Sequence, residues 1–220
     1  DRLHNMRTLH HIQKSEKRSR IARETLDIYA PLAERIGMQE LMNELESLSF
    51  PHVYPEAYES IMKRLDYLHD NTENIRDEVI NELEKIFLKN HLEVEVVGRR
   101  KQPYSIWKKI TYRNVSLESQ ADLFAFRVIV DGAEDCYRAL GVIHDYWQAV
   151  PGLLKDYISM PKPNGYQSIH TVVIGPQRKR IEVQIRSTEM DVIAEKGVAA
   201  HWRYKNHASK KERALLVNRS

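Results

Sequence analysis

The segment from Pro161 to His170 gathers side chains that together could bind a nucleotide. Its two prolines favour extended backbone, and Gly165 permits conformations that are costly for other residues, so we expect a stiff, shaped loop. The loop carries a cation, amides, a hydroxyl, an aromatic ring and an imidazole, namely Lys162, Asn164, Gln167, Ser168, Tyr166 and His170. A cation suits phosphate, and an aromatic plane suits a base. On the residues alone, a proline and glycine turn that leads into a strand is the alternative.

A second group of candidate residues is basic. Between Gly98 and Arg113 the chain has six cations and no acidic residue: Arg99, Arg100, Lys101, Lys108, Lys109 and Arg113. Such a cluster creates a local positive field even in a chain of nearly balanced charge. Arginine can bind phosphate oxygens as a fork or lie flat on a base, whereas lysine acts as a point charge. The same composition also fits a solvated helix face or a non-specific contact with RNA.

Two carboxylates are placed where they could act on phosphates. Asp122 precedes the apolar run 123–130, and a carboxylate at the end of a strand lies where loops meet a cleft. Glu182 lies in the alternating segment 181–186, whose side chains would point to opposite faces of a strand. The apolar face would hold Ile181, Val183 and Ile185, and the polar face Glu182, Gln184 and Arg186. A strand-start cap for Asp122 and a solvent-facing Glu182 are the alternatives.

The first 90 residues are expected to be helical. Apolar residues recur there at three- and four-residue steps, which indicates amphipathic helices with charged outer faces. Pro31 should kink or divide the first long helix, and Gly37 should weaken it. A proline-rich break at residues 50–55 should separate it from the next helix.

From residue 92 the pattern changes to strands interleaved with helices. Strands are expected at 93–97, 122–130, 169–174 and 180–186, and helices at 105–113, 133–150 and 188–204. This order predicts an α+β (α/β) fold, with a helical N-terminal segment followed by a domain with a mixed β-sheet flanked by helices. We predict domain limits of 1–50 and 51–91 for the helical parts, 92–207 for the mixed domain and 208–220 for a polar tail.

The composition sets limits on the class of protein. The chain has 220 residues, and 34 Lys and Arg against 31 Asp and Glu leave a net charge of +3, so it is not coated in cations. A single cysteine, Cys136, excludes an intrachain disulfide and is expected to be a core thiol in a reducing, cytoplasmic compartment. No apolar run approaches the ~18 residues that span a bilayer, so no membrane contact is expected. The chain begins with Asp1, and we expect it to be a fragment.

Several of these motifs closely resemble the synthetase domain of the RelA/SpoT family, the (p)ppGpp synthetases. The resemblance covers roughly residues 90–207, with the motifs in the order of the family. They are Gly98–Lys108 (GRRKQPYSIWK), Ala121–Val128 (ADLFAFRV), Lys155–Ile158 (KDYI), Pro161–His170 (PKPNGYQSIH), Ile181–Arg186 (IEVQIR) and Gly197–Trp202 (GVAAHW). Residues 1–9 (DRLHNMRTL) resemble the end of the HD-type hydrolase domain of the same family.

The resemblance implies a nucleotidyltransferase-like fold and a specific reaction. The family transfers the β,γ-diphosphate of ATP to the ribose 3′-hydroxyl of GDP or GTP in the stringent response. It implies ATP binding by Arg99, Lys101 and Ser105, and GDP or GTP binding by Lys155, Lys162, Asn164, Tyr166 and His170, with Tyr166 stacked on guanine and Lys155, Lys162 and His170 on phosphates. It also implies Mg²⁺ on Asp122. Glu182 would bind the same ion or activate the attacking hydroxyl, and the sequence leaves these two roles open.

Other questions also stay open. Leu153 replaces the Arg of the Arg-x-Lys-Asp motif that bifunctional members usually carry, although Lys155 and Asp156 keep the rest, so GDP and GTP remain alternatives as acceptors. The rival functions are a non-catalytic nucleotide- or RNA-binding module, a helical assembly segment, and nucleotidyl transfer at the α-phosphorus. Contact with RNA or the ribosome is not expected from these residues, and the oligomeric state is left open.

Hydrolase activity is not expected from residues 1–220. Asp1 matches the last metal ligand of the family's hydrolase site, but the preceding His and His-Asp ligands are not in this sequence. The measurement is release of pyrophosphate from ppGpp in the presence of Mn²⁺. Clear turnover would contradict the prediction.

Overall fold

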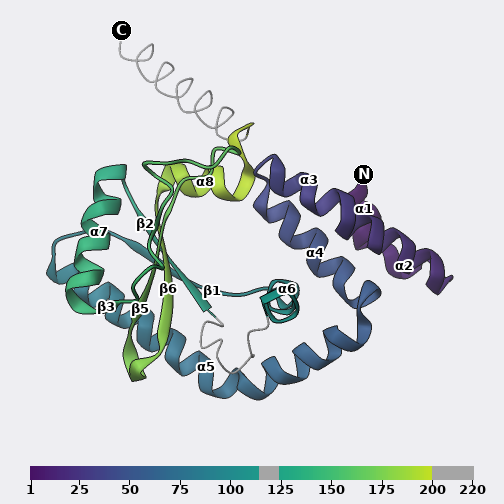
Figure 1. The fold of residues 1–220 in the computed structure, drawn as a ribbon, viewed down its shortest axis with the longest axis horizontal. Helices are drawn as coiled ribbons and strands as arrows, with labels where there is room; N and C mark the ends of the chain where they lie inside the picture. The colour runs from purple at the N-terminus through teal and green to yellow at the C-terminus, as the bar shows by residue number, and fades with distance from the viewer. Residues whose placement is uncertain (114–123, 200–220) are drawn as a thin grey trace, which may run out of the picture.

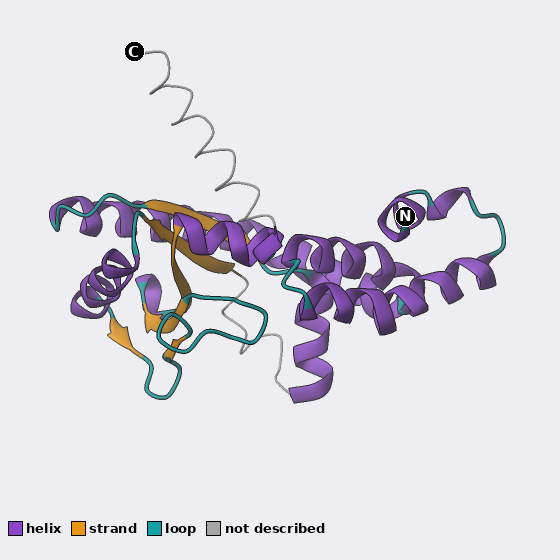
Figure 2. Ribbon diagram, turned by 90° about the horizontal axis from the view of Figure 1, so that it is seen from above, coloured by secondary structure: helices purple, strands orange, loops and turns teal. Residues whose placement is uncertain are grey.

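The computed structural model describes residues 1–113 and 124–199, apart from the side chains of residues 68–73, 113 and 124. Asp122 and the end of the predicted last helix lie outside the described residues. A helical half lies beside a mixed sheet (Figures 1 and 2). The helices of the helical half are α1 (Arg2–Arg7), α2 (Ser15–Glu24), α3 (Ala30–Arg35), α4 (Gln39–Val53) and α5 (Pro55–Lys89). Around the sheet lie α6 (Pro103–Arg113), α7 (Ala133–Tyr146) and α8 (Thr188–Lys196).

The helical prediction for the first 90 residues is confirmed, and the break between α4 and α5 at Tyr54 lies within the predicted residues 50–55. A single π-helical turn, Thr25–Tyr29, joins α2 to α3, so the helix continues through Pro31 with a changed hydrogen-bond register. Pro51 lies inside the last turn of α4, and the break comes only at Tyr54. Phe50 explains the position of this break, because its ring is buried against Tyr104 and Trp107 of α6 and holds the last turn of α4 in place.

The sheet is mixed, as predicted, and contains six strands within the described residues. The strands are β1 (Glu95–Arg100), β2 (Phe124–Val130), β3 (Gln148–Ala149), β4 (Lys155–Asp156), β5 (Ile169–Ile174) and β6 (Arg180–Ser187). Their order is β1-β2-β6-β5-β3, with β4 beside β5; β2 and β6 run parallel, and the other pairs are antiparallel.

The two faces of the sheet differ in chemistry. Alternate residues of β2, β5 and β6 form one core with α5 and α7, including Val128, Val173 and Val183. Cys136 of α7 is buried in the same core, as expected, and burial raises the pKa of its thiol to about 11. The intervening residues of these strands project from the opposite, polar face, which is where the candidate site lies. No helix in the described part of the chain combines the length and apolar character needed to cross a bilayer.

Several predicted boundaries differ from those of the structure. Strand β1 begins at Glu95, two residues later than expected, and extends through Arg99 and Arg100. Helix α7 ends at Tyr146, and the chain then adds the short strand β3. Helix α8 is interrupted after Lys196 because Gly197 takes a positive φ of 81°, and residues 198–199 are helical again.

The helical half and the mixed domain meet at two glycines with positive φ. Gly37 links α3 to α4, and a methyl group added there would lie 3.2 Å from the carbonyl oxygen of Asn164 and 3.7 Å from the Cα of Gly197. A methyl group added at Gly197 would lie 3.2 Å from the carbonyl oxygen of Ile36. The Asn164 amide also donates to the carbonyl oxygen of Glu34 at 3.2 Å. The helical half therefore lies in close contact with the Pro161–His170 loop.

Replacing Gly37 by alanine is expected to lower the free energy of unfolding by at least about 1 kcal/mol. Both the positive φ of 79° and the tight contact with Asn164 oppose a side chain at this position. Urea denaturation measures the change. The matched control is Gly141→Ala in α7, where an added methyl group has nothing within 4 Å and the unfolding free energy should stay the same or rise. Equal behaviour of the two variants would contradict the packing argument.

Candidate active site

A cavity of about 310 Å³ lies over the polar face of the sheet. Its wall comes from both halves of the chain. The lining residues are Glu34, Gln39, Asn43, Arg99, Arg100, Lys101, Gln102, Ser105, Lys109, Ala125, Arg127, Lys162, Asn164, Tyr166, His170, Glu182, Gln184, Arg186 and Glu195. Of the predicted site residues within the described part of the chain, all except Lys155 line this cavity.

Lys101 and Glu182 form a close ion pair in the wall of the cavity. The Lys101 Nζ lies 2.8 Å from the Glu182 Oε2, and the side chains are only 13% and 21% exposed. Burial would raise the pKa of Glu182, but the charge and hydrogen bond of Lys101, a hydrogen bond from Gln184 and the charge of Lys109 together lower it to about 2. Glu182 is therefore a carboxylate throughout the neutral range and carries negative charge into a largely cationic site.

The basic cluster divides between two surfaces. Arg99, Arg100, Lys101 and Lys109 line the cavity, whereas Arg113 has no described side chain. Lys108 points instead to α4, where its Nζ lies 2.7 Å from the Oε1 of the buried Glu46. Ser47 of α4 also donates to the Gln102 side chain at 2.8 Å, so α4 fixes the position of α6 and of the segment before it. Part of the predicted phosphate-binding cluster is thus structural.

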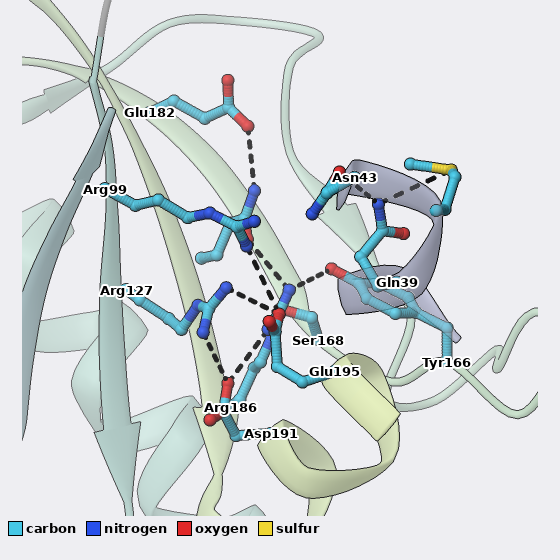
Figure 3. Close-up of polar contacts among 12 residues, drawn as sticks. Gln39, Asn43, Arg99, Arg127, Tyr166, Ser168, Glu182, Arg186, Asp191 and Glu195 are labelled. Atoms are coloured by element: carbon cyan, nitrogen blue, oxygen red, sulfur yellow. Dashed lines mark hydrogen bonds and ion pairs between the residues drawn. The ribbon is translucent and has the colours of Figure 1, made fainter. Parts of the chain in front are cut away.

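A network of three arginines and two carboxylates lies at one end of the cavity (Figure 3). Arg127 of β2 binds Asp191 and Glu195 of α8 at 3.2 and 2.8 Å, and Arg186 of β6 binds Asp191 at 3.0 Å. Arg99 reaches Glu195 at 3.4 Å. The sequence analysis did not assign these contacts. The only local signal was the spacing of Asp191 and Glu195, which places both carboxylates on one face of α8.

The loop of Tyr166 forms a neighbouring part of the wall. The Lys162 ammonium lies 4.9 Å from the centre of the Tyr166 ring and 4.8 Å from that of Tyr157. Asn164 stabilises the loop itself, because its Oδ1 accepts from the Tyr166 amide at 3.1 Å and its amide donates to Glu34. A cation and an aromatic ring at this wall can hold phosphate and a base.

Two predicted nucleotide ligands have different surroundings than expected. Lys155 is exposed and does not line the cavity, and its backbone pairs with that of His170 where β4 lies beside β5. His170 does line the cavity, but burial lowers its pKa to about 4; the charge of Glu182 opposes this shift, and the cations Arg186, Lys162 and Lys155 add to it. A neutral imidazole is a poor partner for phosphate.

The helical half contributes an unexpected part of the wall. Gln39 and Asn43 lie one turn apart on α4, and the Gln39 amide donates to the Asn43 Oδ1 at 3.1 Å (Figure 3). With Glu34 they line the cavity beside the Tyr166 loop. The sequence analysis assigned this region only to packing, and its apolar periodicity gives no signal for a polar site.

A family model for a region found in RelA/SpoT proteins matches residues 98–209, just over half of the chain. The chain belongs to the RelA/SpoT family. An HD-domain model matches residues 1–39, in agreement with the resemblance at the N-terminus. Between them the two family models leave residues 40–97 unassigned, so the predicted domain limits stay predictions.

Curated RelA/SpoT relatives cover nearly the whole chain. It is 51% identical over 209 residues to the GTP pyrophosphokinase rsh of Brucella ovis, which is 95% of this chain and 28% of that protein. It is 45% identical over 207 residues to the bifunctional (p)ppGpp synthase/hydrolase SpoT of Escherichia coli K12, which is 94% of this chain and 29% of that protein. The chain therefore spans less than a third of the length of these relatives.

A solved structure supports the fold of this RelA/SpoT member. The small alarmone synthetase 1 from Bacillus subtilis superimposes with a TM-score of 0.50 at 19% identity, over 70% of this chain and 98% of that one. At this identity the likeness concerns the fold alone. The predicted combination of a helical segment and a mixed sheet flanked by helices is confirmed.

Proposed function

We propose that this chain is a (p)ppGpp synthetase, which transfers the β,γ-diphosphate of ATP to the ribose 3′-hydroxyl of GDP or GTP and releases AMP. The observation that carries the proposal is the shared cavity: the buried Lys101–Glu182 pair and the Tyr166 loop line the same space. A base-binding wall and a charged wall are what the transfer of a diphosphate between two nucleotides requires. The family membership and the names of the relatives support the same reaction.

The proposed reaction needs positioning and charge neutralisation. The acceptor 3′-oxygen forms a bond to the β-phosphorus of ATP while the bond from that phosphorus to the α,β-bridging oxygen breaks, and AMP leaves with the bridging oxygen. Arg99, Arg100 and Lys109 would balance the phosphate charge. Glu182 is our preferred acceptor for the proton of the 3′-hydroxyl. ATP phosphates would attract Lys101 away from Glu182, and the pKa of Glu182 would then rise toward the range of a useful base.

Mg²⁺ belongs to the proposal as a neutraliser of phosphate charge. The ion prefers hard oxygen ligands and is commonly held by one or two carboxylates together with substrate phosphates. Glu182 fits this role because it is ionised and lines the cavity. Asp122, the other expected ligand, comes two residues before the start of β2 and lies outside the described residues. In the described residues no three His, Cys, Asp or Glu side chains converge. Substrate phosphates would complete the coordination.

The test is a product assay with γ-labelled ATP, Mg²⁺ and either GDP or GTP. Labelled ppGpp or pppGpp together with AMP is the expected result, and its loss in Asp122→Asn and Glu182→Gln would tie the reaction to the two carboxylates. Release of pyrophosphate would instead indicate nucleotidyl transfer at the α-phosphorus. Bound nucleotide without product would favour a binding module, and RNA binding of steep salt dependence would favour an RNA contact.

A further inference from the structure

The hydroxyl of Tyr166 is held by residues from two strands. Its oxygen lies 2.6 Å from the His170 Nε2 of β5 and accepts a hydrogen bond from the Arg186 Nη2 of β6 at 2.8 Å. Figure 3 shows the tyrosine pointing across the cavity wall at Arg186. A hydroxyl has one proton to donate and can accept as well, so these two contacts use both of its capacities.

Arg186 has its other contacts inside the protein. Its side chain is only 4% exposed, and it bonds Asp191 at 3.0 Å and the Gln184 Oε1 at 2.9 Å. The Ser168 hydroxyl, itself buried, lies 3.4 Å from the Arg186 Nε. Because these contacts hold the Arg186 guanidinium in place, it is a fixed donor for the Tyr166 hydroxyl. It has little freedom to move toward a substrate phosphate.

His170 completes the arrangement as the acceptor. The charged groups that face it are Glu182 and Arg186 from β6, Lys155 from β4 and Lys162 from the loop. Burial and the surrounding cations lower the pKa of His170 to about 4, so its imidazole is neutral at pH 7. In the neutral tautomer that carries its proton on Nδ1, Nε2 accepts the Tyr166 proton. Tyr157 packs edge-on against both rings, with centroids 6.0 Å from Tyr166 and 5.3 Å from His170.

We propose that Arg186 and His170 are positioning residues, which fix the Tyr166 ring in the orientation that stacks on the base of the acceptor nucleotide. His170 then acts through Tyr166 and does not hold phosphate. This inference rests on the proposed function, because it takes the guanine nucleotide as the ligand of this wall. It predicts that the Tyr166 hydroxyl contributes to binding although it never touches the nucleotide.

The experiment compares Tyr166→Phe, His170→Leu, His170→Gln and the double variant Tyr166→Phe/His170→Leu in the full 220-residue chain. GDP binding without ATP is measured by calorimetry, and KM is measured for each substrate. Tyr166→Phe should weaken GDP binding about three- to tenfold, the value of one hydrogen bond, with the KM for ATP changed less than twofold. His170→Leu should have the same effect, the double variant should be no worse than either single one, and glutamine, whose amide can replace Nε2, should restore binding.

Several results would overturn the positioning role. These are GDP binding unchanged in Tyr166→Phe, additive losses in the double variant, or a KM for GDP in the wild type that rises between pH 5.5 and 7.5 as a charged histidine deprotonates. Tyr166→Phe removes one oxygen and keeps the arginine network, so it tests the idea even where His170→Leu does not fold. If the variants change GDP binding as expected but the wild type makes no product, the proposed reaction is refuted and the positioning role is not. Product formation that is indifferent to Tyr166→Phe would refute the positioning role alone.

Discussion

Replacing Glu182 by glutamine is expected to lower kcat for diphosphate transfer by about two to four orders of magnitude, the usual contribution of a positioned proton acceptor. The side chain keeps its shape but loses the charge that Lys101 binds at 2.8 Å, and an amide can neither take the 3′-hydroxyl proton nor serve as an anionic ligand for Mg²⁺. The measurement is the initial rate of ppGpp or pppGpp formation at saturating ATP and acceptor.

The matched control for this change is Glu59→Gln, an exposed carboxylate on α5 that lies outside the cavity wall. Its rate should equal that of the wild type, and a loss below tenfold in Glu182→Gln would remove Glu182 from the reaction. A titration with Mg²⁺ separates the two roles that remain open. A lost ligand raises the concentration of Mg²⁺ that is required, whereas a lost base lowers the rate at every concentration.

Replacing Lys101 by methionine should lower kcat/KM for ATP about ten- to hundredfold, the range expected for a lost charge-assisted contact. It should also change the pH profile. Lys101 is the chief cause that keeps the pKa of Glu182 at about 2, and without it the burial of Glu182 raises the pKa of this carboxyl. The activity of Lys101→Met should then fall as the pH decreases through the raised pKa of Glu182. In the wild type Glu182 is still ionised at that pH. The profile of kcat/KM between pH 5 and 9 measures the shift.

A second lysine and glutamate pair provides the control for Lys101→Met. Lys108 and Glu46 lie 2.7 Å apart between α6 and α4, and Glu46 is buried. Lys108→Met should lower the midpoint of thermal unfolding, because it leaves a buried carboxylate without its cation, but it should not move the acidic limb of the activity profile. If the acidic limb is the same in Lys101→Met and the wild type, the ionisation of Glu182 does not control the reaction rate.

Local sequence patterns predicted one side of the site well. The two-residue alternation of 181–186 correctly assigned Ile181 and Val183 to the core and Glu182 to the polar face, because the strand period alone decides the face. The composition of the loop likewise predicted a binding role for Lys162 and Tyr166, and both residues line the cavity. These inferences needed no knowledge of which strands are neighbours.

The contacts between distant segments could not be predicted in this way. The arginine network depends on the parallel pairing of β2 with β6, in which Ala125 lies opposite Glu182 and Arg127 opposite Gln184. No local pattern fixes that register across more than fifty residues of chain. The same holds for Glu34, whose carbonyl meets Asn164 across 130 residues, and for α4, whose periodicity indicated only packing.

The junction at Gly37 and Gly197 has a consequence for how this family can be divided. The segment matched as an HD domain ends at residue 39, yet Glu34 and Gln39 line a cavity whose other lining residues, apart from Asn43, lie in the segment matched to RelA/SpoT proteins. A chimaera that joins the synthetase region of one relative to the HD region of another would therefore exchange part of the cavity wall as well. Such hybrids should fold stably only where the residues on both sides of the Gly37–Gly197 contact pack together as they do here. The unit that can be exchanged is therefore larger than either matched region.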